Sequence, residues 1–273
     1  MVLVERLRRF WRKPLRDKVW SLRAHLAPWL PLPMRLEFGA WWLVWYDSTS
    51  HRIYQRSYEP NTQAFLKGFL KTGMTVLDIG AHHGFYTLLA ARCVGLVGKV
   101  TAFEPSPRER RRLIWHVRLN RCPQVLVEPF ALSDREGTME LYLTQDNSAN
   151  SLSPPKISPI VGKVTVKVTT LDAYCQRNRI ERVDLVKMDA EGAELLILQG
   201  AKKLLQGKLR PVIITEVNPQ TAVRFGYSVD DLKAFLTELK FHCVAVPGEE
   251  NVIAAPTERM EEVAVITERC WRT

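Results

Sequence analysis

Short apolar runs alternate with amphipathic stretches along most of this chain. Runs rich in β-branched residues predict strands near 75–79, 99–103, 124–130, 183–188, 211–216, 241–246 and 262–267. Apolar residues at helical spacing predict helices near 61–70, 85–94, 107–120, 193–205 and 229–239. Asn61 is a candidate N-cap for the first of these helices. Strands that alternate with helices in this way predict an α/β fold with a doubly wound, mostly parallel sheet.

The region between residues 137 and 170 breaks this alternation. It contains two strand-like segments, 138–143 and 163–168, around a polar loop at 145–159 that is rich in Ser, Asn and Pro. We expect two added strands that flank this loop. Long loops in compact domains are commonly lids or disordered segments, and the pattern leaves both alternatives open.

The first 57 residues follow a different pattern, so we divide the chain into an N-terminal extension, 1–57, and a main domain, 58–273. Apolar residues at near-helical spacing within 3–26, interrupted by Pro14, predict one or two short amphipathic helices. The Trp- and Tyr-rich stretch 34–58 predicts a small β-hairpin packed against the core.

Positive charge is concentrated at the N-terminus. Residues 1–35 contain nine Lys or Arg against two acidic residues, which accounts for +7 of the net charge of +10. A basic end on a nearly balanced body indicates a local docking surface rather than a surface for nucleic acid. One interpretation is a helix that lies on an anionic membrane; the other is a helix packed on the core with its charges in water. The first interpretation uses the apolar residues Leu3, Leu7, Phe10, Trp11, Leu15, Trp20 and Leu26.

The cysteines and the apolar runs indicate a cytoplasmic protein. The five cysteines are dispersed, their number is odd, and no Cys-x-x-Cys occurs, which argues against a disulfide framework or a structural zinc site. Charged residues interrupt every apolar run in the first 24 residues, so a secretory signal is not expected. The apolar run 40–46 is far shorter than the roughly 20 residues that span a bilayer.

The most informative local pattern lies at 75–104. The strand at 75–79 contains Asp78 and opens into a turn with Gly80 and Gly84, and the next apolar run ends on Glu104. Glycines without a side chain would let a ligand approach the backbone, and a carboxylate at the second strand end is typical of a ribose contact. An acid just before the first glycine would repel a pyrophosphate and attract a cationic amino-acid group. We therefore favour S-adenosylmethionine as the cofactor over a turn without a ligand.

The wider set of motifs resembles the FkbM family of S-adenosylmethionine-dependent methyltransferases. The resemblance covers roughly residues 58–247, and the most specific element is Lys187-Met-Asp-Ala-Glu-Gly-Ala-Glu194. The family commonly has Asn where this chain has His82. The other motifs are Tyr58-Glu-Pro60, Phe103-Glu-Pro105, Ala131-Leu-Ser-Asp134, Thr170-Leu-Asp172, Leu198-Gln-Gly-Ala201 and Pro211-Val-Ile-Ile-Thr-Glu216.

The resemblance implies a Rossmann-like class I methyltransferase fold and a set of cofactor-binding residues. The turn residues are expected to hold the methionine part of S-adenosylmethionine, Glu104 the ribose, and the loop after the third strand the adenine. The full set of candidates is Asp78, Gly80, Ala81, His82, Gly84, Tyr86, Glu104, Ser133 and Asp134.

Methyl transfer to a neutral hydroxyl also needs a base near the acceptor. Asp189 or Glu191 is the first candidate, with His82 as the next. Asp189, Glu216 and Asn218 also resemble, in placement, the magnesium ligands of catechol-type O-methyltransferases. A carboxylate base needs no metal, so the sequence leaves metal dependence open.

The predicted function is O-methylation. The resemblance implies an acceptor hydroxyl on a sugar, a glycolipid or a secondary metabolite. Two rival functions are a nucleic-acid (RNA) methyltransferase and a non-enzymatic, membrane-associated module. The strand end at 189 reads Asp-Ala-Glu-Gly, whereas an amino-methylase would be expected to show Asn/Asp-Pro-Pro-Tyr there. We therefore expect a small-molecule or glycolipid acceptor, not nucleic acid. Peripheral contact with an anionic membrane through residues 1–35 stays one of the two interpretations of the basic end.

Overall fold

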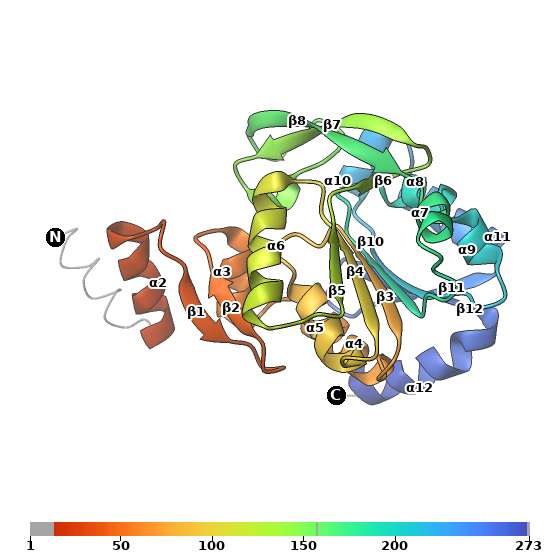
Figure 1. Ribbon diagram of the computed structural model, residues 1–273, viewed down its shortest axis with the longest axis horizontal. Helices are drawn as coiled ribbons and strands as arrows, with labels where there is room; N and C mark the ends of the chain where they lie inside the picture. Colours follow the sequence, from red (N-terminus) through yellow and green to blue (C-terminus); the bar gives the residue numbers. More distant parts are fainter. Residues whose placement is uncertain (1–13, 157, 272–273) are drawn as a thin grey trace.

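A seven-stranded sheet forms the centre of the computed structural model, which describes residues 14–156 and 158–271 (Figure 1). Its strand order is β11–β12–β10–β9–β3–β4–β5, and all strands are parallel except β12, which runs antiparallel to both of its neighbours. This confirms the predicted doubly wound, mostly parallel sheet. The strands are β3 (Thr75–Ile79), β4 (Lys99–Phe103), β5 (Val125–Glu128), β9 (Leu185–Met188), β10 (Val212–Glu216), β11 (Phe241–Ala245) and β12 (Asn251–Pro256).

Helices cover both faces of this sheet because its strands are apolar on both sides. Neighbouring residues such as Val76 and Leu77 pack into two different hydrophobic clusters, as the twofold period of a strand requires. One face carries α4 (Pro60–Phe69), α5 (Phe85–Val94), α6 (Pro107–Leu119) and α12 (Met260–Trp271). The other carries α7 (Leu171–Arg177), α8 (Glu194–Gln199), α9 (Lys202–Gln206) and α11 (Val229–Glu238).

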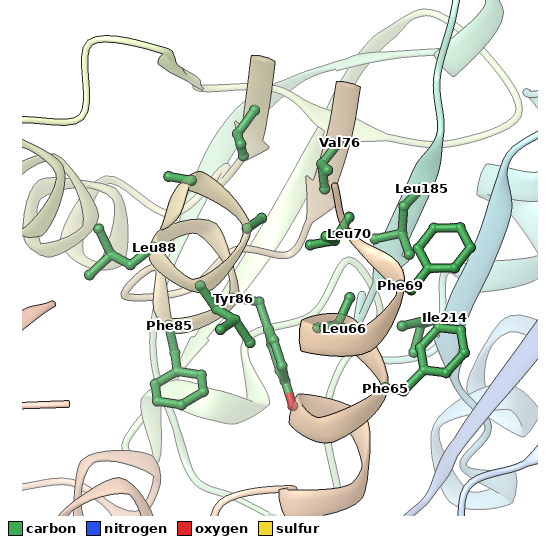
Figure 2. Close-up of a cluster of buried hydrophobic side chains, with 14 of the residues drawn as sticks. Phe65, Leu66, Phe69, Leu70, Val76, Phe85, Tyr86, Leu88, Leu185 and Ile214 are labelled. Carbon is green, nitrogen blue, oxygen red and sulfur yellow. The ribbon is translucent and has the colours of Figure 1, made fainter. Parts of the chain in front are cut away.

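The larger cluster lies between the sheet and α4 and α5. Phe65 and Phe69 of α4 lie near Leu185 and Ile214 of the sheet (Figure 2). Burying each side chain of this size contributes about 1.5–3 kcal/mol to folding. This packing fixes the first turn of α5, and with it the turn that joins β3 to α5.

Residues 131–169 form a separate three-stranded sheet across one end of the main sheet, at the top of Figure 1. It consists of β6 (Ala131–Leu132), β7 (Gly137–Thr144) and β8 (Ile160–Thr169). β7 and β8 pair antiparallel, which confirms the two added strands, and both are longer than predicted. The loop between them contains a short 3₁₀ turn, Asn147–Ala149.

The N-terminal extension begins, within the described residues, with α2 (Leu15–Leu26), followed by the hairpin β1 (Leu32–Arg35) and β2 (Trp41–Val44). The predicted hairpin ends earlier than expected, because α3 (Ser48–Tyr54) follows; the Asp47 carboxylate caps it by accepting from the Ser50 N–H. Trp42, Val44 and Ile53 belong to the larger core cluster, so the extension and the main domain share one core. The predicted amphipathic positions Leu3, Leu7, Phe10 and Trp11 lie outside the described residues.

The predicted strand at 262–267 is wrong, because this segment is part of α12. Val263 and Thr267 are buried four residues apart, whereas Val265 between them is 62% exposed, which is a helical period. The strand of this region is β12, whose six residues are all buried. Its Asn and Pro ends interrupt the apolar pattern, which is why the sequence did not reveal it.

Two further details differ from the sequence prediction. Asn61 is not the N-cap, because α4 begins one residue earlier at Pro60. The Asn61 N–H instead donates to the Glu249 carboxylate at 2.7 Å, a partner 188 residues away. The predicted helix 193–205 is two helices, α8 and α9, which meet at Gly200. Among the helices of the described residues, none is long and apolar enough to cross a bilayer.

Candidate active site

A cavity opens at the carboxyl ends of β3, β4 and β9. The chain runs from β3 to one side of the sheet and returns to β9 on the other, and ligands of open α/β sheets bind at such a switch point. The cavity has a volume of about 1010 Å³, including the part that is open to solvent. Its wall includes the turn after β3, the ends of β4 and β9, part of the extension, residues 130–132, and the loop between β7 and β8.

Most of the predicted cofactor residues line this cavity. Those that do are Asp78, Gly80, Ala81, His82, Tyr86 and Glu104. Gly84, Ser133 and Asp134 are not part of the wall, and the Ser133 hydroxyl donates to Asp134 instead. On that side of the cavity the wall consists of Phe130, Ala131 and Leu132.

The two glycines of the turn have a structural role that the sequence did not predict. A Cβ atom on Gly80 would lie 1.8 Å from the backbone oxygen of Asp189, and one on Gly84 would lie 2.3 Å from Leu113 Cδ1. Protein atoms therefore occupy the position that a side chain on either glycine would need. Both residues also have positive φ, +72° and +89°, which disfavours a side chain.

Two carboxylates of the turn region are buried. Glu104 accepts hydrogen bonds from the N–H groups of His82 at 2.7 Å and Ser106 at 2.8 Å. Burial nevertheless raises the pKa of Glu104 to about 8. Asp78 accepts from the Thr87 hydroxyl, and burial raises the pKa of Asp78 to about 6.

Lys187 is a cavity residue to which the sequence analysis assigned no role. It is buried in β9, its Nζ lies 3.6 Å from Asp189 Oδ2, and it lies 5.2 Å from the centre of the Tyr86 ring. Burial alone would lower the pKa of Lys187, but the surrounding carboxylates, Asp189 foremost, raise it overall. One feature of the sequence could have indicated this site: a lysine lies inside the apolar run Leu185–Met188, and a buried cation needs nearby anions.

Asp189 and Glu191 follow β9 and both line the cavity. Glu191 has a positive φ of +52°, and its carboxylate lies 3.7 Å from Arg224 Nη2. Burial first, and then the nearby carboxylates of Asp189 and Glu194, raise the pKa of Glu191 to about 8. The side chain of Asp189 is more exposed than that of Glu191.

The two histidines of the turn stack on each other with ring centres 3.7 Å apart. Arg112 Nη1 lies 3.1 Å from His83 Nε2; because a guanidinium can only donate, Nε2 accepts, and His83 carries its proton on Nδ1. Burial lowers the pKa values of His82 and His83. His82 has a φ of +50°, in the left-handed region that Asn tolerates better than most residues.

The residues proposed from sequence for magnesium do not gather in the cavity. Asp189 lines it, but Glu216 and Asn218 do not, and the Asn218 amide binds Gln220 N–H and Glu250. Another group with metal-ligand side chains occurs in the described part of the chain: His82, His83 and Glu109. Arg112 occupies the acceptor nitrogen of His83, and Glu109 already accepts from Ser106, Arg108 and Asn150, so this group is poorly suited to a cation.

The loop between β7 and β8 forms part of the cavity wall. Ser151 Oγ donates to the backbone oxygen of Glu191 at 2.9 Å, and Asn150 Nδ2 donates to Glu109 at 3.1 Å. Asn147 Nδ2 lies 3.4 Å from His83 Nε2. The position of these residues fits the lid alternative for the loop.

Comparison with known families gives a match over most of the sheet. Residues 78–243 match the family described as the methyltransferase FkbM domain. The chain is similar to 2-O-methyltransferase NoeI of Sinorhizobium fredii (strain NBRC 101917 / NGR234), with 30% identity over 153 residues. That match covers 50% of this chain and 60% of NoeI, so the chain spans less than two thirds of the length of that relative.

Two solved structures are also similar to this chain, at low sequence identity. The methyltransferase FkbM of Methylobacillus flagellatus KT matches with 14% identity and a TM-score of 0.46, covering 76% of this chain and 54% of that one. A SAM-dependent O-methyltransferase of Thermotoga maritima matches with 17% identity and a TM-score of 0.44, covering 82% and 77%.

Proposed function

The chain belongs to the FkbM family of S-adenosylmethionine-dependent methyltransferases, and from this premise we propose that it methylates a hydroxyl group of a small molecule. The observation that carries the proposal is the cavity at the ends of β3, β4 and β9, whose wall contains Asp78, Glu104, Asp189 and Glu191. The name of the relative NoeI, a 2-O-methyltransferase, supports oxygen as the accepting atom. A sugar, a glycolipid or a secondary metabolite is the proposed acceptor class.

The charges in the cavity fit S-adenosylmethionine. When bound, this cofactor supplies an activated methyl group on a positively charged sulfur. Asp78 provides negative charge for its cationic groups, and Lys187 provides a cation for its carboxylate. Glu104 is the proposed partner of the ribose hydroxyls, and its two backbone hydrogen bonds hold the carboxylate in place.

We assign the base to Asp189, ahead of Glu191 and His82. The Lys187 ammonium group 3.6 Å away stabilises the negative charge of Asp189, and the carboxylate reaches the cavity. Glu191, with its pKa of about 8, holds a proton over much of the neutral range. In the ionised state, Asp189 can accept the acceptor's proton at a carboxylate oxygen.

The remaining wall fits a polyhydroxylated acceptor. Trp42, Tyr58 and Phe85 contribute aromatic surface, and Asn147 and Asn150 contribute amide groups that can donate and accept. A mainly apolar wall with a few directed polar groups is typical of a small-molecule site.

The proposal can be tested with a cofactor that carries an isotopically labelled methyl group. The enzyme is incubated with a metabolite and lipid extract, and mass spectrometry identifies compounds that gain the label. We expect one hydroxyl-bearing class to gain one methyl group. Asp189→Asn should lower turnover of that compound by about 10²–10⁴-fold with cofactor affinity nearly unchanged. Labelling on nitrogen, or a fully active Asp189→Asn, would contradict the proposal.

A further inference from the structure

Within the described residues, helix α2 contacts the rest of the protein through one face. Trp20 stacks on His51 of α3 with ring centres 4.5 Å apart and on Tyr54 at 5.6 Å. The amide of Gln55 donates to the Asp17 carboxylate at 2.5 Å. These contacts hold the polar and aromatic face of α2 against α3 and the residue that follows it.

The opposite face of α2 is apolar and exposed. Its four residues follow each other at intervals of four, three and four, which places them on one side of a helix. We call them the exposed stripe: Leu15 (77% exposed), Val19 (39%), Leu22 (55%) and Leu26 (72%). Trp29, three residues after the last residue of the helix, is 74% exposed. In residues 14–156 and 158–271, none of these side chains packs against a hydrophobic cluster.

The charge of the same segment indicates what covers the stripe. Residues 1–35 carry nine basic residues against two acidic ones, whereas the rest of the chain is nearly balanced. Nucleic acid would match the charge but would leave the apolar side chains in water. An anionic lipid surface matches both, because Lys and Arg contact headgroups while Leu and Trp enter the acyl boundary.

We propose that α2 binds an anionic membrane surface through the exposed stripe and Trp29. The position of α2 gives this contact a consequence for the cavity. Trp20 packs on α3, and Thr49 and Ile53 of α3 line the cavity wall. Membrane binding therefore holds the extension side of the cavity close to the lipid. The docking proposal does not depend on methyl transfer, so either can fail alone.

The test is a flotation assay of the full chain with phosphatidylcholine vesicles, with and without phosphatidylserine. We expect binding only when phosphatidylserine is present, and weaker binding as salt rises. Leu22→Gln combined with Leu26→Gln should lower vesicle binding by about tenfold or more. Leu96→Gln combined with Val97→Gln, two exposed apolar residues that follow α5, should leave it unchanged. Trp29→Ala is a second variant outside the helix, and thermal unfolding confirms that each variant is folded.

Several results would overturn the proposal. Equal binding to neutral vesicles would do so, as would no binding to either kind of vesicle. Unchanged binding by the Leu22→Gln, Leu26→Gln variant, here called the stripe variant, would also do so. Self-association in solution that the stripe variant abolishes would assign the stripe to a second copy of the chain, and would also overturn it.

Discussion

Gly80 packs the turn after β3 against Asp189, the residue that follows β9. Its missing side chain leaves room for the Asp189 backbone oxygen, which would lie only 1.8 Å from an added Cβ. Since that oxygen belongs to backbone, it cannot move aside without shifting the end of β9. The position of the proposed base therefore depends on a glycine in the turn after β3.

We predict that Gly80→Ala destabilises the protein by about 3 kcal/mol or more. Gly73→Ala is the matched control, because Gly73 also has a positive φ, +88°, but no atom lies within 4 Å of an added Cβ. The control should cost only about 1 kcal/mol. Urea unfolding of both variants gives the comparison. Equal losses would mean that the contact with Asp189 is not the cause.

Sequence reasoning at the residue scale placed residues in the cavity correctly at the ends of β3, β4 and β9, but not at the end of β10, where Glu216 and Asn218 lie outside the wall. Asp78, Glu104 and Asp189 lie at or next to strand ends, and in a parallel sheet these ends meet. It missed groups that arrive from other parts of the chain. Glu249, which binds the first turn of α4, is an example, because no local pattern connects residues 188 positions apart.

Among the elements, α12 shows how the burial pattern of a segment distinguishes a helix from a strand. In a strand, Val263 and Val265 would point to the same side, whereas in a helix they point to different sides. Val263 is fully buried and Val265 is largely exposed. The helix also packs on α4, where Ile266 lies 3.0 Å from the position of a Cβ on Gly68.

We predict that Val263→Ala lowers the free energy of unfolding by about 2 kcal/mol, because it leaves a cavity between α12 and the sheet. Val265→Ala, with the same chemistry on the exposed side, should change it by less than about 0.5 kcal/mol. Chemical denaturation of the two variants measures both changes in the free energy of unfolding. Similar losses for both would contradict the assignment of this segment as a helix.

The elements that sequence predicted well are those with strong local patterns. The central strands and α5, α6 and α11 have long apolar periods bounded by Gly, Pro or Ser. β12 was missed because its Asn and Pro ends interrupt the apolar pattern. Part of α12 was misassigned because residues 263–266 form a short apolar run, which periodicity alone does not assign to a strand or a helix. Tertiary packing determines the secondary structure of both segments.

At the scale of the whole molecule, buried titratable groups make stability depend on pH. The pKa of Glu104 and that of Glu191 rise from 4.5 to about 8 on folding. The folded state therefore binds more protons than the unfolded chain between these values, and stability falls as pH rises. The buried His116 acts in the opposite direction, because its pKa falls from 6.5 to about 4, so its effect ends near pH 6.5.

We therefore predict that the cofactor-free protein loses stability between pH 6.5 and 8, by up to about 2 kcal/mol for each of the two glutamates. Glu104→Gln should reduce this slope, since a neutral amide does not titrate. Urea unfolding at several pH values without S-adenosylmethionine measures this change of stability with pH. Stability that is constant or increases over this range would show that these carboxyl groups ionise normally.

Calorimetric titration of the chain with S-adenosylmethionine tests the proposed cofactor site most directly. We propose that the cavity at the ends of β3, β4 and β9 holds this cofactor, with Glu104 on its ribose. We expect saturable binding by the unaltered chain, and binding weaker by about ten- to a hundredfold in a folded Glu104→Gln variant. Glu37→Gln, a change at an exposed carboxylate paired with Arg56, should bind normally. No binding by the unaltered chain, or equal affinity in Glu104→Gln, would contradict the claim.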